Sequence, residues 1–181
     1  MTAGVTCLEL TLTTPHALEC LAAITQDYGA AAAIGAGTVR NRQDATAALT
    51  AGAAFLVAPT LATDVAEIAA DARVPFYPGA LTPTEIAAAW DSGASCVKVF
   101  PAMVGGPAYI RQIRAPLPDI ALMPTGGVTI AEAPAYLQAG AAYVGMGSPL
   151  IQDALEGGDI GALRDRAQRL LALIQDADGR R

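Results

Sequence analysis

The stretch DSGASCVKVFPA (residues 91–102) contains the junction between a predicted helix and a predicted strand, and the predicted fold depends on this junction. Gly93 follows an alanine-rich segment, and a glycine at that place supplies the left-handed residue that commonly ends a helix. The run CVKVF comes directly afterwards and has the length and the apolar, β-branched character of a buried strand. We therefore expect a helix that ends at Gly93 and leads straight into a strand.

The same helix-to-strand junction recurs at Ala51-Gly52-Ala53 and Ala139-Gly140-Ala141. Helix starts with capping residues are predicted at Thr14-Pro15, at Thr82-Pro83-Thr84-Glu85 and at Thr129-Ile130-Ala131-Glu132. The strand-like runs cover residues 7–12, 31–39, 54–60, 74–81, 96–102, 120–127 and 142–148. Strands alternating with helices predict a parallel sheet, and this many units favour a TIM-type (βα) barrel that forms one domain over residues 1–181.

Seven strand-like runs are found, whereas a complete barrel of this type has eight strands. Residues 1–5, MTAGV, resemble the helix ends that precede the other strands. The expectation from these two observations is a barrel that lacks its first βα unit. A doubly wound open sheet is the alternative fold.

Composition narrows the class of protein and its partners. Hydrophobic residues make up 53% of the chain and charged residues 15%, which excludes a disordered protein. The formal charge is −6, and no basic cluster predicts a nucleic-acid partner. No apolar run approaches the roughly 18 residues of a membrane span. The amino terminus lacks a basic region typical of signal peptides, and the three cysteines have no Cys-x-x-Cys spacing, so we expect a cytoplasmic protein with reduced thiols.

Lys98 is the residue that most strongly indicates chemistry. It is the single lysine among 11 basic residues, and it lies inside the apolar run CVKVF. Alternation along a strand places it on one face with Cys96 and Phe100. Burial of an ammonium group lowers its pKa, and a partly neutral amine can attack a ketone. The alternative interpretation is a structural lysine that is paired with a buried carboxylate.

Glu9 is the candidate partner of that lysine. In CLELTL (residues 7–12) the leucines share one face of the strand, and Glu9 lies on the other. If the leucines face the helices, Glu9 points to the same side as Lys98. A carboxylate there could transfer protons, or it could only neutralise the lysine; the sequence leaves both open.

Glycine-rich turns lie at the carboxyl ends of several of the predicted strands. IGAGTV (34–39) carries Thr38, whereas PTGGV (124–128) and GMGS (145–148) end the last two runs. Loops at these last positions of a barrel frequently bind phosphate through backbone amides. One histidine, His16, and scattered acids predict no metal site, and no dinucleotide fingerprint is present. We therefore expect no cofactor.

Together these motifs resemble one family, the 2-keto-3-deoxy-6-phosphogluconate (KDPG) and 4-hydroxy-2-oxoglutarate (KHG) aldolases. The resemblance runs from about residue 3 to residue 175 and is carried by an ordered set of motifs. These are LELTL (8–12), IGAGTV (34–39), YPGALTPTE (77–85), KVFPA (98–102), GGPAYI (105–110), MPTGGV (123–128) and GMGS (145–148).

The resemblance implies a homotrimeric lyase without a metal or cofactor. Such an enzyme cleaves a phosphorylated 2-keto-3-deoxy sugar acid, or KHG, to pyruvate and an aldehyde such as glyceraldehyde 3-phosphate. It further implies that Lys98 forms the imine and that Glu9 moves protons. The implied substrate-binding residues are Thr13, Thr38, Pro59, Phe100, Thr125, Gly126, Gly127, Gly147 and Ser148. Thr38 would contact the pyruvyl part, and the last five would hold the phosphate.

Two departures from the family pattern leave alternatives open. Thr13 stands where most sugar-acid members carry an arginine that binds the substrate carboxylate, although some relatives with galactonate-type substrates lack it. The missing first βα unit would have contributed a second arginine. A phosphate-binding isomerase or epimerase, in which Lys98 and Glu9 act only as acid and base, is one rival. A truncated, non-catalytic relative is the other.

Overall fold

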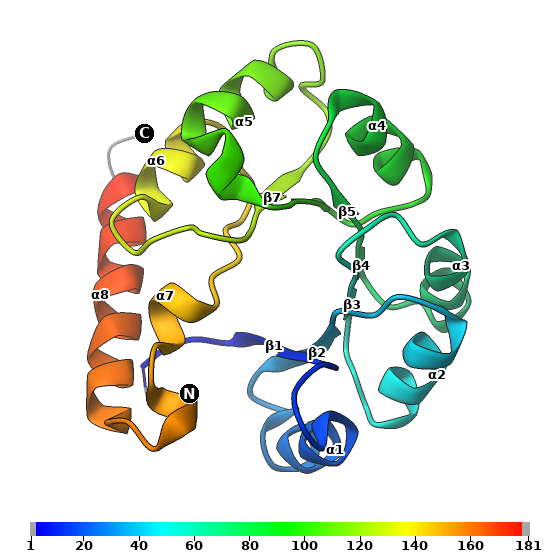
Figure 1. Cartoon of the computed structure of the whole chain (residues 1–181), viewed down its shortest axis with the longest axis vertical. Coiled ribbons are helices and arrows are strands. Elements are labelled where there is room, and N and C mark those ends of the chain that lie inside the picture. Colours follow the sequence, from blue (N-terminus) through cyan, green and yellow to red (C-terminus); the bar gives the residue numbers. More distant parts are fainter. Residues whose placement is uncertain (1–2, 179–181) are drawn as a thin grey trace. The chain divides into compact units, whose positions relative to one another are not determined.

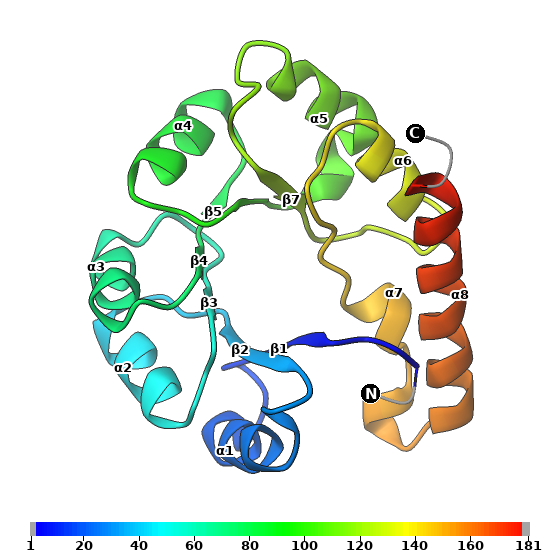
Figure 2. The same cartoon turned by 180° about the vertical axis from the view of Figure 1, so that it is seen from behind.

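The structure is a computed structural model that describes residues 3–178 (Figures 1 and 2). The chain divides into two compact units, and each is described by itself. The N-terminal unit is Thr6–Lys98, and the C-terminal unit is Val99–Arg181 with Met1–Val5. The boundary falls inside strand β6 (Val97–Val99). The single domain over residues 1–181 stays a prediction.

The N-terminal unit is built on parallel strands. Strands β1 (Cys7–Thr11), β2 (Ala33–Gly37), β3 (Leu56–Val57) and β4 (Phe76–Tyr77) form a parallel sheet in sequential order. The other elements are α1 (Ala17–Tyr28), α2 (Arg42–Thr50), α3 (Thr63–Ala72), β5 (Gly79–Ala80) and α4 (Pro83–Asp91). In Figures 1 and 2, α1, α2 and α3 lie on the same side of this sheet. This alternation confirms the predicted βα pattern.

The core of the N-terminal unit joins these helices to the sheet. Leu21 from α1, Ile34 and Leu56 from the sheet, and Val65 from α3 are at most 2% exposed. Burying each of these side chains stabilises the fold by about 1.5–3 kcal/mol. Leu10 and Leu12 pack against the same cluster, which confirms that these leucines face the helices. Leu8 does not follow them, because it is 39% exposed.

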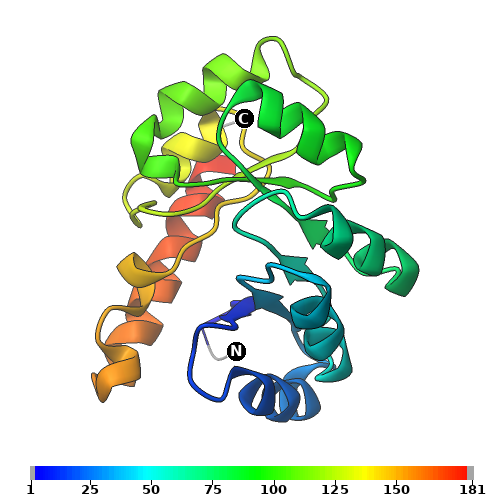
Figure 3. The ribbon, with the colours of Figure 1, turned by 45° about the vertical axis from the view of Figure 1, so that its right-hand side comes forward.

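The C-terminal unit contains the strand β7 (Leu122–Pro124) and a series of helical elements. Its helical elements are η1 (Ala102–Val104), α5 (Gly106–Arg114), α6 (Ala133–Gln138), α7 (Ser148–Ile151), η2 (Ala154–Glu156) and α8 (Ile160–Asp178). Helix α8 packs along α6 and α7, as Figure 3 shows. No helix within residues 3–178 has the length and apolar character needed to cross a membrane.

The predicted helix ends are confirmed, but two of the three predicted starts are wrong. Gly52, Gly93 and Gly140 have φ of +93°, +90° and +100°, the left-handed conformation expected of a C-cap. Thr82 and Glu85 form the predicted capping box. Helix α1 begins at Ala17 rather than at Thr14-Pro15, because His16 adopts φ +55° and interrupts the helical turn before it. Helix α6 begins at Ala133, after the predicted start at Thr129-Ile130-Ala131-Glu132.

Two predicted strands differ from the structure. The run 74–81 is broken into β4 and β5 at Pro78, which has no N–H to give to the ladder. The run 142–148 forms no named strand; only Gly145 pairs, in an isolated parallel bridge with Thr125. Glycine is a poor strand residue, and this segment carries Gly145 and Gly147.

Candidate active site

Lys98 and Glu9 meet within the N-terminal unit. The Lys98 Nζ lies 3.9 Å from the Glu9 Oε1, which makes them an ion pair at the long end of the range. Lys98 is 7% exposed on β6, whereas the Glu9 side chain on β1 is 28% exposed. The predicted juxtaposition of these two residues is therefore confirmed. The carboxylate reaches solvent more readily than the amine does, so water can exchange protons with it.

The surroundings of Lys98 favour its neutral form. Burial lowers the pKa of Lys98, and the nearby Glu9 carboxylate opposes part of that effect. The same burial acts in the opposite direction on a thiol and raises the pKa of Cys96 to about 12. At a given pH, Lys98 thus holds a larger fraction of free amine than an exposed lysine, while Cys96 stays a thiol. The amine is the group equipped to act as a nucleophile.

Backbone contacts place Lys98 on a rigid strand. Its N–H donates to the carbonyl of Pro78 at 2.8 Å, and both neighbours, Val97 and Val99, are fully buried. Phe100 was predicted to share the face of Lys98, but the strand ends at Val99 and Phe100 is 40% exposed. The period-2 rule therefore holds only as far as the strand itself extends.

The glycine at the end of β2 makes room for the Glu9 carboxylate. A Cβ on Gly37 would overlap the Glu9 Oε1, and a Cβ on Gly35 would overlap the Phe55 ring. Two of the chain's own side chains therefore occupy the space beside these glycines.

A methyl group at position 37 should move Glu9 without unfolding the unit. In Gly37→Ala the new Cβ meets the flexible end of Glu9, which can turn away, so we expect about a tenfold lower kcat and a nearly unchanged melting temperature. Steady-state kinetics and thermal melts check this. In a Glu9→Gln background the same substitution should have little further effect; an additive loss would contradict the assignment.

Three other predicted site residues lie in the N-terminal unit at strand ends. Thr38 follows β2 with φ +60°, a conformation that costs a β-branched residue about 1–3 kcal/mol and is typical of functional sites. Thr13 follows β1, is exposed, and donates its hydroxyl to the Thr11 Oγ1 at 3.2 Å. Pro59 follows β3 and packs its carbonyl against Gly79.

The C-terminal unit holds the remaining predicted residues. The Thr125 N–H donates to the Val99 carbonyl at 3.0 Å, which fixes the PTGG turn beside the end of β6. Gly126 and Gly127, with φ of +89° and +81°, lie against Phe100 and Met103 respectively. The bridge from Thr125 to Gly145 brings the GMGS segment, with exposed Gly147 and Ser148, alongside that turn. The two glycine-rich loops therefore begin next to each other.

Sequence analysis missed a residue that supports these loops. Tyr136 on α6 is 2% exposed, and its hydroxyl donates to the Ala102 carbonyl at 3.3 Å. The bond ties α6 to the segment that follows Phe100. A tyrosine within a short helix gives no signal of such a role, because its partner is a backbone carbonyl 34 residues away.

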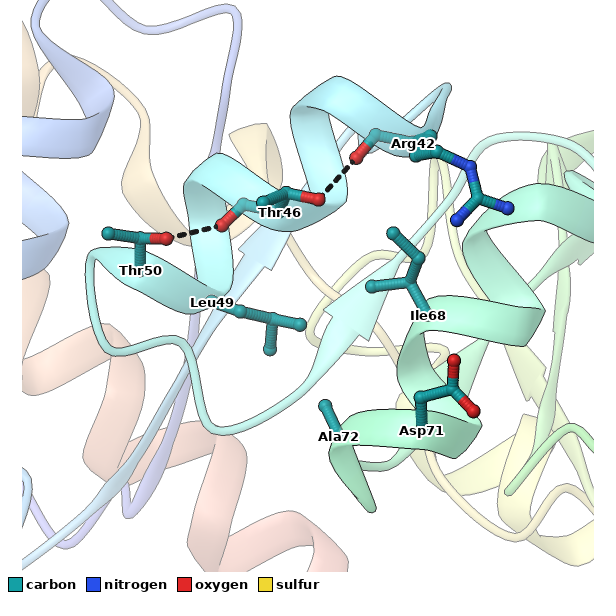
Figure 4. A pocket seen from close by; sticks show the side chains of 7 residues that line it. All are labelled: Arg42, Thr46, Leu49, Thr50, Ile68, Asp71 and Ala72. Atoms are coloured by element: carbon teal, nitrogen blue, oxygen red, sulfur yellow. Dashed lines mark hydrogen bonds between the residues drawn. The ribbon is translucent and has the colours of Figure 1, made fainter.

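A separate hollow of about 300 Å³ lies between α2 and α3 (Figure 4). Leu49 and Ile68 face each other across it, and Arg42 lies at one end. It includes neither Lys98 nor Glu9. Within residues 3–178, no group of three His, Cys, Asp or Glu residues could hold a metal ion.

Comparisons with known proteins identify the family and the fold. The family model of the KDPG and KHG aldolases matches residues 1–165. The 2-dehydro-3-deoxy-6-phosphogalactonate aldolase of Escherichia coli is 36% identical over 149 residues, covering 82% of this chain and 73% of that protein. A solved structure described as native KDPGal superposes with a TM-score of 0.92 at 31% identity, covering 98% of this chain and 85% of that one.

A further solved structure bears on the chemistry. The KDPG aldolase of Legionella pneumophila, described with pyruvate captured as a covalent carbinolamine intermediate, matches with a TM-score of 0.82 at 25% identity. It covers 93% of this chain and 82% of that one. A carbinolamine is the first adduct of an amine with a ketone, which is the reaction that a desolvated lysine favours.

The fold is of the TIM-type α/β class, and with a buried lysine beside a carboxylate it defines a class I aldolase, a carbon–carbon lyase. The chain belongs to the KDPG and KHG aldolase family.

Proposed function

We propose that the chain cleaves a 2-keto-3-deoxy-6-phospho sugar acid to pyruvate and an aldehyde phosphate through an imine on Lys98. The observation that carries this proposal is the single lysine of the chain, 7% exposed and 3.9 Å from a carboxylate. Its lowered pKa leaves a larger fraction of free amine at a given pH than an exposed lysine has. The isomerase alternative requires no amine nucleophile and predicts no covalent adduct.

The reaction begins with the neutral Lys98 amine, which attacks the C2 ketone and forms a carbinolamine. Loss of water gives an iminium ion. The iminium then accepts the electron pair of the C3–C4 bond as that bond breaks. Glu9, directly or through water, takes the proton of the C4 hydroxyl, and the aldehyde leaves. The remaining enamine is protonated at C3, and hydrolysis releases pyruvate and restores the lysine.

The other predicted residues are proposed as binding groups for that substrate. Thr38, Pro59 and Phe100 would contact the pyruvyl part, and the two glycine-rich loops would hold the phosphate. Members of the loops are Thr125, Gly126, Gly127, Gly147 and Ser148. Positive φ at Gly126 and Gly127 turns their backbone in a way that other residues rarely adopt, which supports an anion-binding turn.

Thr13 favours one epimer of the substrate. A threonine there offers one hydroxyl, and in the structure that hydroxyl donates to Thr11. It cannot replace the bidentate arginine of most sugar-acid members. Because some relatives with galactonate-type substrates lack that arginine, we propose the phosphogalactonate derivative as the preferred substrate, with the phosphogluconate derivative and KHG as weaker ones. The enzyme is further proposed to be a cytoplasmic homotrimer.

Borohydride trapping tests the central step. The protein is incubated with pyruvate and sodium borohydride, digested, and analysed by mass spectrometry. We expect a reduced pyruvyl adduct on the peptide that contains Lys98. A folded sample without that adduct would refute the imine mechanism and would favour either an isomerase or a non-catalytic relative. Comparing kcat/KM for the two sugar-acid epimers and KHG then tests the substrate preference.

A further inference from the structure

The side chain of Arg166 on α8 binds the carboxyl-terminal end of the short helix α7. The Arg166 Nε donates to the Leu150 carbonyl at 2.7 Å, and its Nη2 donates to the Ile151 carbonyl at 2.9 Å. One planar guanidinium therefore binds two consecutive backbone carbonyls. These carbonyls belong to a helix of four residues, too short to be stable alone. The pair of hydrogen bonds from Nε and Nη2, here called the Arg166 fork, replaces the hydrogen bonds that a longer helix would supply.

The segment that Arg166 holds has an unusual backbone at both ends. Gly147, before α7, has φ −114° and ψ −109°, and Gln152, after it, has φ +49° and ψ −123°. A non-glycine residue in the latter conformation is strained and persists only when its surroundings fix it. The two carbonyls that Arg166 binds immediately precede Gln152. Its fork therefore acts where the chain needs an external restraint.

The position of Arg166 itself is well defined. The next residue, Ala167, is 5% exposed and Leu170 is 7% exposed, so this face of α8 is anchored in the unit. No salt bridge of Arg166 occurs in the part of the chain that the structure describes. The guanidinium of Arg166 thus binds backbone carbonyls of α7 rather than a carboxylate.

We infer that Arg166 is a positioning residue for the phosphate of the substrate, an inference that rests on the proposed function of Gly147 and Ser148. These two residues begin the turn whose other end Arg166 holds. If the fork is removed, the turn loses its restraint and Gly147 and Ser148 lose their fixed place. Arg166 touches no substrate atom in this proposal and acts only through α7.

The test separates binding of phosphate from the chemistry on Lys98. Arg166→Lys keeps the charge but loses the fork, and Arg166→Gln loses both. Arg169→Lys, an exposed position on the same helix, is the matched control. Aldol addition with pyruvate is measured with glyceraldehyde 3-phosphate and with unphosphorylated glyceraldehyde. Binding of inorganic phosphate is measured by calorimetry.

For both Arg166 variants we expect about a tenfold higher KM for the phosphorylated aldehyde and about tenfold weaker phosphate binding. The kcat, the kinetics with glyceraldehyde and the borohydride trapping on Lys98 should stay as in the unaltered protein and in Arg169→Lys. An equal loss with both aldehydes, or unchanged phosphate binding, would overturn the inference. Absence of trapping in the unaltered protein would instead refute the proposed function, and the phosphate measurement would still test Arg166.

Discussion

Replacing Lys98 by methionine is expected to lower kcat/KM by at least about 10⁴-fold and to abolish borohydride trapping with pyruvate. The amine is the only atom in the proposed reaction that bonds covalently to the substrate, so no other group can supply the electron sink. Lys98→Arg should be equally inactive, because a guanidinium keeps its proton at any accessible pH. Turnover above about a hundredth of the original in either variant would refute the covalent mechanism.

The same variant should be more stable than the unaltered protein. Lys98 is 7% exposed, and its exchange for a hydrophobic side chain of similar volume removes the desolvation cost of a buried charge, which is on the order of several kcal/mol. Glu9, which would lose its partner, has a side chain that is 28% exposed and can be solvated by water. Loss of activity together with a higher melting temperature would show that Lys98 is retained for chemistry rather than for folding.

The pH dependence of stability gives a second check on Lys98. Burial lowers its native pKa below the usual value of 10.5, so the unfolded chain binds more protons between those two values. The free energy of unfolding contributed by Lys98 therefore rises with pH across that window. Chemical denaturation at a series of pH values should show this rise in the unaltered protein, and the difference between it and Lys98→Met isolates the contribution.

The lysine and the glutamate could be predicted because each breaks a local pattern. A charged residue inside CVKVF or CLELTL conflicts with its apolar neighbours, and strand alternation then fixes its face. The glycines that end the helices were predictable for a similar reason, since φ near +90° at Gly52 or Gly93 is a local requirement.

Contacts between distant segments could not be predicted in this way. The fit of Glu9 over Gly37 depends on the register in which β1 pairs with β2, and one sequence does not specify that register. Arg166 has the sequence context of an ordinary helix-surface arginine, and nothing local indicates that it binds two carbonyls of another helix. The break between β4 and β5 has a local cause in Pro78, which has no N–H to give to the ladder, although the predicted run covers residues 74–81 without a break.

Glu9→Gln is expected to lower the rate of cleavage and, at the same time, to raise the neutral fraction of the Lys98 amine. A proton-transfer group contributes about 10²–10⁴-fold to the rate, so kcat for cleavage should fall by that factor. At the same time, removal of the carboxylate removes the interaction that raises the pKa of Lys98, while burial still lowers it. The pKa of Lys98 then falls further, and more of the amine is neutral at a given pH.

Trapping of pyruvate on Lys98 by borohydride, measured across a pH series, reports that second effect directly. Because Lys98 is the single lysine, one modified peptide reports its titration without interference from other lysines. In Glu9→Gln the rise in trapping with pH should occur at lower pH, even though cleavage is slower. If Glu9 only neutralised the lysine, the same shift would appear while kcat stayed within about twofold at its optimum. The two roles that the sequence leaves open therefore differ in one measurable quantity, the maximal rate of carbon–carbon cleavage.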